Sequence, residues 1–118
     1  EMVVASAHRT PEKVQGIVKD AHTKYKAIIA AAGKAAHLPG VIAGHTVVPV
    51  IGVPMKTSDL GGVDSLYSIV QMPKGVPVAT VAINGAVNAA ILAAQVIGVC
   101  EEEVRNRLLD YKEEMKNA

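Results

Sequence analysis

Ser6, His8 and Arg9 form a short cluster of chemically useful side chains directly after an apolar stretch, residues 2–5. A histidine changes its protonation state near neutral pH and can serve as both an acid and a base. An arginine beside it offers a planar set of donors that suits a phosphate or a carboxylate. These residue types favour acid–base chemistry on an anionic small molecule. The plain alternatives are a solvated turn histidine at position 8 and an ordinary surface charge at position 9.

A second cluster, Gly33, Lys34 and His37, follows another apolar stretch. Glycine permits a tight turn and a close approach of backbone to a ligand, but a glycine-containing turn alone is weak support for a phosphate site. His37 either contacts the ligand or caps the helix that follows, and Lys34 either faces the ligand or is solvated. Polar side chains also follow the two later apolar stretches, at Lys56, Ser58, Asn84 and Asn88.

The elements that must position these clusters alternate between short apolar stretches and helical patterns. Thr10 and Pro11 suit the N-cap and first position of a helix, and the apolar residues after them recur at helical spacing as far as Ala21. We expect strands at residues 2–5, 27–31, 49–53 and 78–83, and helices at 11–21, 38–45, 63–71, 86–97 and 101–117.

This alternation predicts an α/β fold with a doubly wound parallel sheet in three layers, α/β/α. Ligands of such sheets bind beyond the carboxyl ends of the strands, which would bring the four polar clusters to one edge. The nearly continuous apolar sequence of 86–97 predicts a helix that is buried on most sides. We divide the chain into an α/β domain at 1–98 and an amphipathic C-terminal helix at 99–118, which packs either on its own domain or on a neighbouring subunit.

Composition excludes several classes of protein. The chain has 118 residues, half of them hydrophobic, which is enough for one domain with a core. Its net charge is +1 without a basic stripe, which argues against nucleic acid as a partner. No apolar stretch suits a membrane span, the start lacks the features of a signal peptide, and no metal-ligand spacing occurs. The single cysteine, Cys100, cannot form an internal disulfide, so we expect a cytoplasmic setting.

Several stretches stand in the order and spacing of a known family. They are SAHRTP (6–11), AAHLPG (35–40), GVP (52–54), DSLYSIVQMPKGVPVATVAI (64–83) and NAAILAAQVIG (88–98). The chain closely resembles the N5-carboxyaminoimidazole ribonucleotide mutases of purine biosynthesis, in particular the bacterial type. The resemblance implies a flavodoxin-like sheet and a homo-oligomer, usually an octamer, whose active sites lie at subunit contacts.

The resemblance also implies an activity. These enzymes move a carboxyl group from the exocyclic nitrogen of the imidazole ring to ring carbon C4, without ATP, metal or organic cofactor. CO2 is released and recaptured in a closed site while a histidine, matched here by His8, shuttles a proton. Ser6 and Arg9 match residues that hold the ribose phosphate. The substrate-binding residues that the resemblance implies are Ser6, Arg9, Gly33, Ala36, His37 and Leu38.

Two departures from the family pattern matter for function. Family members normally begin with a further strand and helix joined by a Gly-Ser-x-Ser-Asp turn, whereas this sequence begins at what would be the second strand. Ala31 and Lys34 stand where the family loop has glycines. An inactive or impaired family member that serves as an oligomeric assembly module is therefore the alternative. A relative that carboxylates aminoimidazole ribonucleotide directly is a close variant, although the long stretch at 64–83 favours the mutase.

Overall fold

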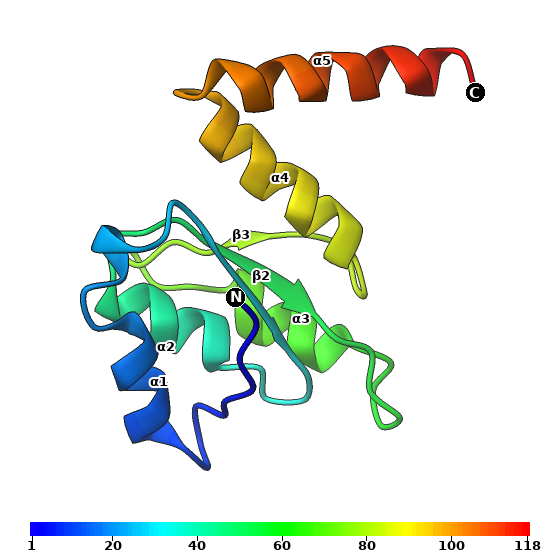
Figure 1. Ribbon diagram of the computed structural model, residues 1–118. Coiled ribbons are helices and arrows are strands. Elements are labelled where there is room, and N and C mark those ends of the chain that lie inside the picture. The colour runs from blue at the N-terminus through cyan, green and yellow to red at the C-terminus, as the bar shows by residue number, and fades with distance from the viewer.

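The computed structural model describes residues 1–118 and contains a parallel sheet with helices on both faces (Figure 1). The predicted three-layer α/β fold is confirmed. In chain order the elements are α1 (Pro11–Val18), the 3₁₀ helix η1 (Ala21–Thr23), β1 (Ile28–Ala32), α2 (Leu38–His45), β2 (Val50–Pro54), α3 (Val63–Val70), β3 (Ala79–Thr80), α4 (Ala86–Gly98) and α5 (Glu102–Lys116).

The sheet has the strand order β1-β2-β3, and both pairings are parallel. Strand β2 lies in the centre and is buried along its whole length, so its side chains are apolar on both faces. Val50 and Gly52 face α2 and α3, whereas Ile51 and Val53 face α4. The parallel direction places the loops after all three strands at one edge of the sheet.

One face of the sheet is covered by α1, α2 and α3. Val14 and Val18 of α1 meet Ile42 of α2 above Ala30 and Val50 of the strands, and all five are buried. Their spacing in α1 is the four-residue repeat of a helix with one buried stripe. This face carries the larger of the two core clusters and holds the polar loops after β1 and β2 in place.

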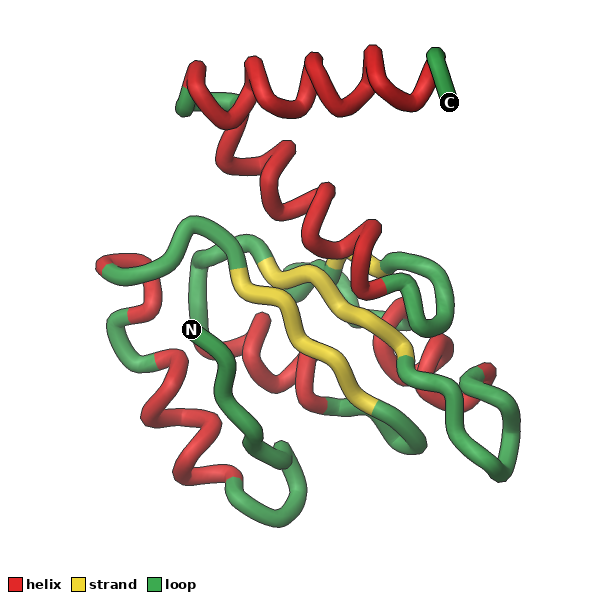
Figure 2. The backbone as a smooth tube through the Cα atoms, turned by 45° about the vertical axis from the view of Figure 1, so that its right-hand side comes forward, coloured by secondary structure: helices red, strands yellow, loops and turns green.

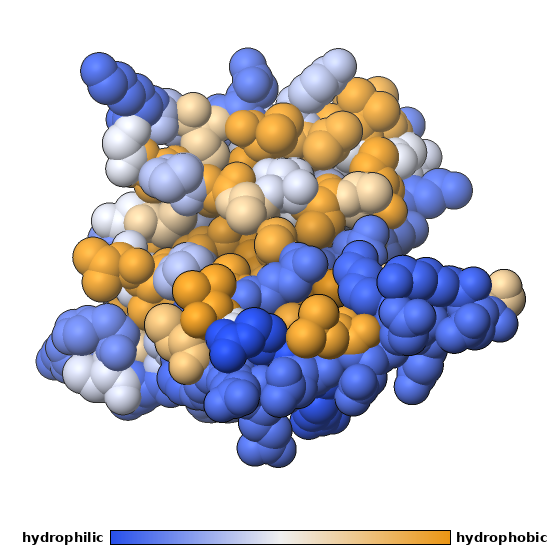
Figure 3. Space-filling view, turned by 90° about the horizontal axis from the view of Figure 1, so that it is seen from above, coloured by the Kyte–Doolittle hydropathy of each residue, from blue (hydrophilic) through white to orange (hydrophobic).

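The other face is covered by α4 alone. Ala89 of α4 packs on Ile51 and Val53 of the central strand, but Ile29 and Ala31 on β1 stay exposed. The expectation that residues 86–97 are buried on most sides is wrong, because the helix has only β2 and β1 beneath its first turns and α5 at its far end. Figure 3 looks onto this side of the molecule and shows a broad apolar area bordered by hydrophilic residues.

Helix α5 packs on α4 and projects away from the sheet (Figure 1). The radius of gyration is 15.0 Å, above the roughly 13.5 Å of a compact chain of this length. Arg105 donates from Nη1 to the carbonyl of Gly98, and Glu101 forms an ion pair with Lys26 beside β1. The division at residues 98 and 99 and the packing of α5 on a neighbouring subunit stay predictions. None of the helices combines the length and apolar character that crossing a bilayer requires.

Residues 2–5 do not form the predicted strand. Figure 2 shows this N-terminal segment as loop. The peptide groups of residues 1–5 make no backbone hydrogen bond, and Met2 and Val4 are almost fully exposed. Apolar alternation alone cannot make a strand, because each strand needs the donors and acceptors of a neighbour. Ala5 still packs against the core cluster around Val14.

Other boundaries also differ from the sequence-based expectation. Helix α1 ends at Val18 instead of Ala21, since the chain leaves the helical region at Lys19 and Asp20 is left-handed with φ of 55°. The strand expected at 78–83 shortens to β3, although Asn84 still donates to the Pro54 carbonyl. Strands β1 and β2 begin one residue later than expected.

Candidate active site

The turn at residues 6–10 is closed by its own side chains. The Thr10 hydroxyl donates to the Ser6 carbonyl and accepts from the Ser6 amide, while the Ser6 hydroxyl accepts from the Arg9 amide. Thr10 occupies the predicted N-cap position of α1, and its carbonyl accepts from the Val14 amide, but its hydroxyl makes no capping bond and closes the turn instead. These bonds fix the direction in which His8 and Arg9 leave the backbone.

His8 and His37 meet at the edge of the sheet although 29 residues separate them. Nε2 of His8 lies 2.8 Å from Nδ1 of His37, and the two exposed rings stand at 74° with centroids 4.9 Å apart. One ring must donate its proton to the other in this bond. His37 also occupies the N-cap position of α2, where its carbonyl accepts from the Val41 amide, but its ring makes no capping bond and is directed to His8.

Arg9 follows His8 in the sequence and is a cation without an ion-pair partner in the chain. Its guanidinium is exposed and makes no hydrogen bond or ion pair with another side chain of the chain. A guanidinium left without an internal partner keeps all its donors for an anionic ligand. The combination of an unpaired cation with two linked imidazoles suits acid–base chemistry on an anionic substrate.

The loop between β1 and α2 contributes backbone more than side chains. Ala36 is buried, and Leu38 packs against the core cluster around Val14, so neither side chain points to an open site. None of the N–H groups of residues 33–36 donates a hydrogen bond within the chain. Adjacent unpaired N–H groups of this kind can cradle an anion. Gly33 and Ala36, both predicted to bind substrate, therefore offer peptide groups.

A second loop, residues 55–62 after β2, packs against the first. A side-chain carbon on Gly33 would stand 3.0 Å from Cγ2 of Thr57, so the two loops are in close contact. Nζ of Lys34 lies 2.9 Å from Oδ2 of Asp59. The Asp59 carboxylate raises the pKa of Lys34 above its usual range. Lys34 is thus engaged by a neighbouring loop and is not a free cation.

This second loop is held by Ser65, which the sequence did not single out, and by Asn84, which the sequence placed at this edge without a role. Ser65 is fully buried in the first turn of α3, and its hydroxyl lies 2.7 Å from the Met55 carbonyl and 2.9 Å from the Gly62 carbonyl. Asn84 has φ of 60° and accepts from the Lys56 amide through Oδ1. The Asn84-Gly85 dipeptide signalled a turn, but nothing in the sequence signalled its contact with Lys56.

The opposite edge of the sheet contains an open hollow of about 820 Å³. His22 and His45 line it with Lys19 and Asp20, away from the linked pair of histidines. Both histidines are exposed. No three metal-binding side chains gather anywhere in the chain. The chemistry therefore concentrates at the carboxyl edge, where cavity size alone does not point.

Comparison with known proteins identifies a family for the whole chain. The whole chain, residues 1–118, matches the family described as AIR carboxylase. The chain belongs to this family.

Curated relatives of the AIR carboxylase family are similar along nearly the full chain. The N5-carboxyaminoimidazole ribonucleotide mutase of Thermotoga maritima is 56% identical over 117 residues, which cover 98% of this chain and 68% of that protein. The enzyme of the same name in Escherichia coli K12 is 55% identical, with 92% of this chain and 66% of the relative covered. A chloroplastic phosphoribosylaminoimidazole carboxylase of Vigna aconitifolia is 52% identical over the whole chain. The chain spans about two thirds of the two mutases and 21% of the carboxylase.

The fold is also that of a solved structure. The crystal structure of Treponema denticola PurE superimposes with a TM-score of 0.85 at 29% identity, covering 96% of this chain and 71% of that one. The AIR carboxylase fold thus accounts for the sheet and its helices. The contact between His8 and His37 is observed in this chain, where the turn at 6–10 and the loop after β1 bring the two rings together.

Proposed function

We propose that the chain moves a carboxyl group from the exocyclic nitrogen of N5-carboxyaminoimidazole ribonucleotide to ring carbon C4. Support comes from curated relatives of that name at about 55% identity. The observation that carries the proposal onto particular residues is the bond between His8 and His37 beside the unpaired Arg9. Such a site offers one group that moves protons and one that holds an anion.

His8 is the proton carrier in this proposal. When the bond from the exocyclic nitrogen to the carboxyl carbon breaks, CO2 leaves. The electron pair of that bond stays on the nitrogen, which takes a proton from His8. Ring carbon C4 then attacks CO2, and the hydrogen on C4 returns to His8 as a proton. His8 ends in its starting state, so one imidazole completes the cycle near neutral pH. Holding CO2 in a closed site makes its recapture effectively intramolecular.

His37 orients the proton carrier. Nε2 of His8 is occupied by the bond to His37, and no group of the chain contacts Nδ1 of His8. Nδ1 of His8 is thus the atom that faces substrate. When His37 donates in the shared bond, the proton of neutral His8 sits on Nδ1 and can pass to the substrate nitrogen.

Arg9 and the loop after β1 bind the parts of the substrate that do not react. The guanidinium binds the ribose phosphate through paired hydrogen bonds. Ser6 holds the turn that presents it, and the unpaired N–H groups of residues 33–36 face the ring and its carboxylate. Contacts remote from C4 fix the ring, so that binding energy is used for orientation.

The test is conversion of N5-carboxyaminoimidazole ribonucleotide by the purified chain. His8→Asn should lower kcat by about 10²- to 10⁴-fold, the range for loss of a positioned acid–base group. His22→Asn serves as the matched control, because His22 is exposed at the opposite edge, and it should keep the wild-type rate. Equal rates for wild type and His8→Asn would exclude catalysis by this residue.

The direct carboxylation of aminoimidazole ribonucleotide by CO2 is the competing reaction. The mutase is favoured because the two relatives of about 55% identity carry that name. Supplying aminoimidazole ribonucleotide with bicarbonate should give slower product formation than supplying the carboxylated substrate at equal concentration. A faster rate from the bicarbonate mixture would reverse the assignment.

We also propose that the chain works as a homo-oligomer in the cytoplasm. Support comes from α4, whose apolar surface is left open on the face that Figure 3 shows, and from the free thiol of Cys100. Exposed apolar areas of this kind mark surfaces that other protein chains cover. Sedimentation equilibrium should give a mass several times 12.3 kDa, and a monomer at micromolar concentration would contradict the proposal.

A further inference from the structure

We propose that the ion pair of Lys34 with Asp59 is a positioning device for the candidate active site. It ties the loop of residues 33–37 to the loop of residues 55–62 and so keeps His37 within reach of His8. The kinetic part of its test rests on the proposed function, whereas the structural part does not.

The ion pair stands where the two loops can be joined. Lys34 Nζ lies 2.9 Å from Asp59 Oδ2. The chain has two other ion pairs, one between Lys26 and Glu101 and one within α5, and neither lies at the carboxyl edge of the sheet. The loops already touch where Gly33 meets Thr57. The ion pair therefore adds a second fixed point to an existing contact.

The backbone at Lys34 supports a role for its side chain. Lys34 has φ of 57°, in the left-handed region where glycine fits without strain and other residues are disfavoured. A non-glycine residue in this conformation persists where surrounding contacts hold it, and such positions cluster at functional sites. The contact with Asp59 is the contact that holds Lys34 here.

The effect reaches His37 through three residues of restrained chain. Ala36 is 1% exposed and cannot move freely, and the His37 amide donates to the Ala35 carbonyl over 2.8 Å. With Ala36 packed and Gly33 against Thr57, Lys34 and Ala35 are the two exposed positions between the fixed ends of the segment. Tethering the Lys34 side chain limits movement at these positions, and the 2.8 Å bond from His37 to His8 depends on it.

Kinetics of N5-carboxyaminoimidazole ribonucleotide conversion test the positioning role. The pair is exposed and screened by solvent, so its loss in Lys34→Ala should raise KM about two- to fivefold, with a smaller change in kcat. The exchanged pair, Lys34→Asp with Asp59→Lys, should recover most of the loss, since aspartate tolerates a left-handed backbone. Asp64 also contributes to the field at Lys34, so Asp59→Asn should be milder than Lys34→Ala.

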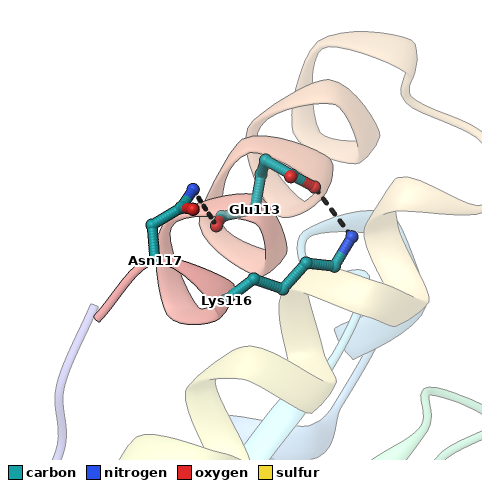
Figure 4. A network of polar contacts seen from close by, with 3 residues as sticks. All are labelled: Glu113, Lys116 and Asn117. Atoms are coloured by element: carbon teal, nitrogen blue, oxygen red, sulfur yellow. Dashed lines mark hydrogen bonds and ion pairs between the residues drawn. The ribbon is translucent and has the colours of Figure 1, made fainter.

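The chain offers a matched control in α5. Lys116 donates to Glu113 over 2.8 Å (Figure 4). The side chains of Lys116 and Glu113 are 69% and 66% exposed, close to the 74% and 58% of Lys34 and Asp59. Lys116→Ala removes an ion pair of the same kind far from both loops. It should leave KM unchanged within about a factor of 1.5, as expected for a surface change away from the site.

A readout without substrate separates this proposal from the proposed function. Hydrogen exchange of the His37 amide should accelerate about two- to fivefold in Lys34→Ala and Lys34→Gly, but not in Lys116→Ala. Lys34→Gly also relieves the left-handed strain, so its Tm should equal or exceed that of wild type while exchange still accelerates. If the ion pair only stabilised the fold, Lys34→Gly would lower the Tm and accelerate the exchange of the His37 amide together.

The outcomes are distinguishable. If the wild-type chain lacks turnover but exchange at His37 responds as described, the proposed function fails and the ion pair keeps its positioning role. Unchanged exchange at His37 in both Lys34 variants overturns the inference, whatever the kinetics. A lower Tm together with faster exchange in Lys34→Gly also overturns it, because the loss would then be one of overall stability.

Discussion

The two faces of the sheet carry similar apolar side chains and differ in what covers them. On the face of α1, α2 and α3, Ala30 and Val50 are buried. On the face of α4, Ile51 and Val53 are buried at the centre, but Ile29 on the neighbouring strand is 44% exposed. An apolar pattern thus predicts that a side chain is excluded from water. It does not predict whether the covering residues belong to the same chain.

The difference also separates chemistry from assembly. The three-helix face fixes the loops that carry His37 and Asp59, because the loops begin and end on its buried strands and helices. The α4 face supports no polar cluster and ends in the projecting α5. Substitutions at the buried positions of the first face should therefore act on folding, and substitutions at the exposed apolar positions of the second face should act on association.

The largest expected effect is on the closed face. Ile69 of α3 is fully buried against Gly52, so Ile69→Ala should lower the free energy of unfolding by about 2–5 kcal/mol. Ile29→Ala on the open face should cost less than about 1 kcal/mol, measured by denaturant unfolding at low protein concentration. Equal losses at the two positions would remove the contrast between the faces.

Association should respond next, and on the open face. Val87 of α4 is 72% exposed, and Val87→Lys should weaken self-association about ten- to hundredfold, the equivalent of one buried valine. Val47→Lys is the control, because Val47 is 87% exposed beside the hollow at the opposite edge. Sedimentation equilibrium measures both variants. A stronger effect at Val47 would move the interface away from α4.

Close packing on the closed face predicts a third effect. A side-chain carbon at Gly52 would stand 2.3 Å from Ile69 and 3.0 Å from Val78, so Gly52→Ala should cost about 1–3 kcal/mol. Gly44→Ala in α2 meets nothing within 4 Å and should stabilise by about 0.5–1 kcal/mol. Thermal unfolding of both variants checks the signs, and a stabilised Gly52→Ala would contradict the packing described here.

The smallest effect concerns the edge where both faces meet. The pKa of Lys34 lies above its ordinary value of 10.5 because of Asp59, with a lesser contribution from Asp64. The ion pair therefore contributes stability fully below about pH 10.5 and loses it as the pH rises through the raised pKa. The Tm difference between wild type and Asp59→Asn should be present near pH 9 and shrink as the pH rises above 10.5. Tyr25, whose pKa Glu1 raises, is common to both proteins and cancels.

Local signals predicted most of the fold, since they do not depend on partners. Pro11 and the four-residue repeat of Val14 and Val18 marked α1 at its start, and the alternation of elements gave the parallel sheet. The strand at residues 2–5 and the burial of α4 were wrong for one shared reason. Both depend on a neighbour across the sheet or the helix face, and a sequence pattern contains no information about that neighbour.

The candidate site was predictable in part. The rule that ligands gather at the carboxyl ends of strands placed His8 and His37 at one edge, and the structure brings the two rings into contact. Their roles in catalysis stay predictions. The engagement of Lys34 by Asp59 could not be foreseen, because the two charges lie on separate loops and only the folded backbone sets their distance.

The joint between α4 and α5 fixes the orientation of α5 relative to the rest of the chain. A side-chain carbon at Gly98 would stand 3.3 Å from Leu108 and 3.4 Å from Arg105. The guanidinium of Arg105 donates to the carbonyls of Gly98 and Val99 at the end of α4. The two helices therefore cross too closely to swing independently. A second copy of the chain that docked on α5 would therefore be held at a fixed orientation relative to the sheet. The angle between α4 and α5 would then set the distance and the tilt between the candidate active sites of the two copies.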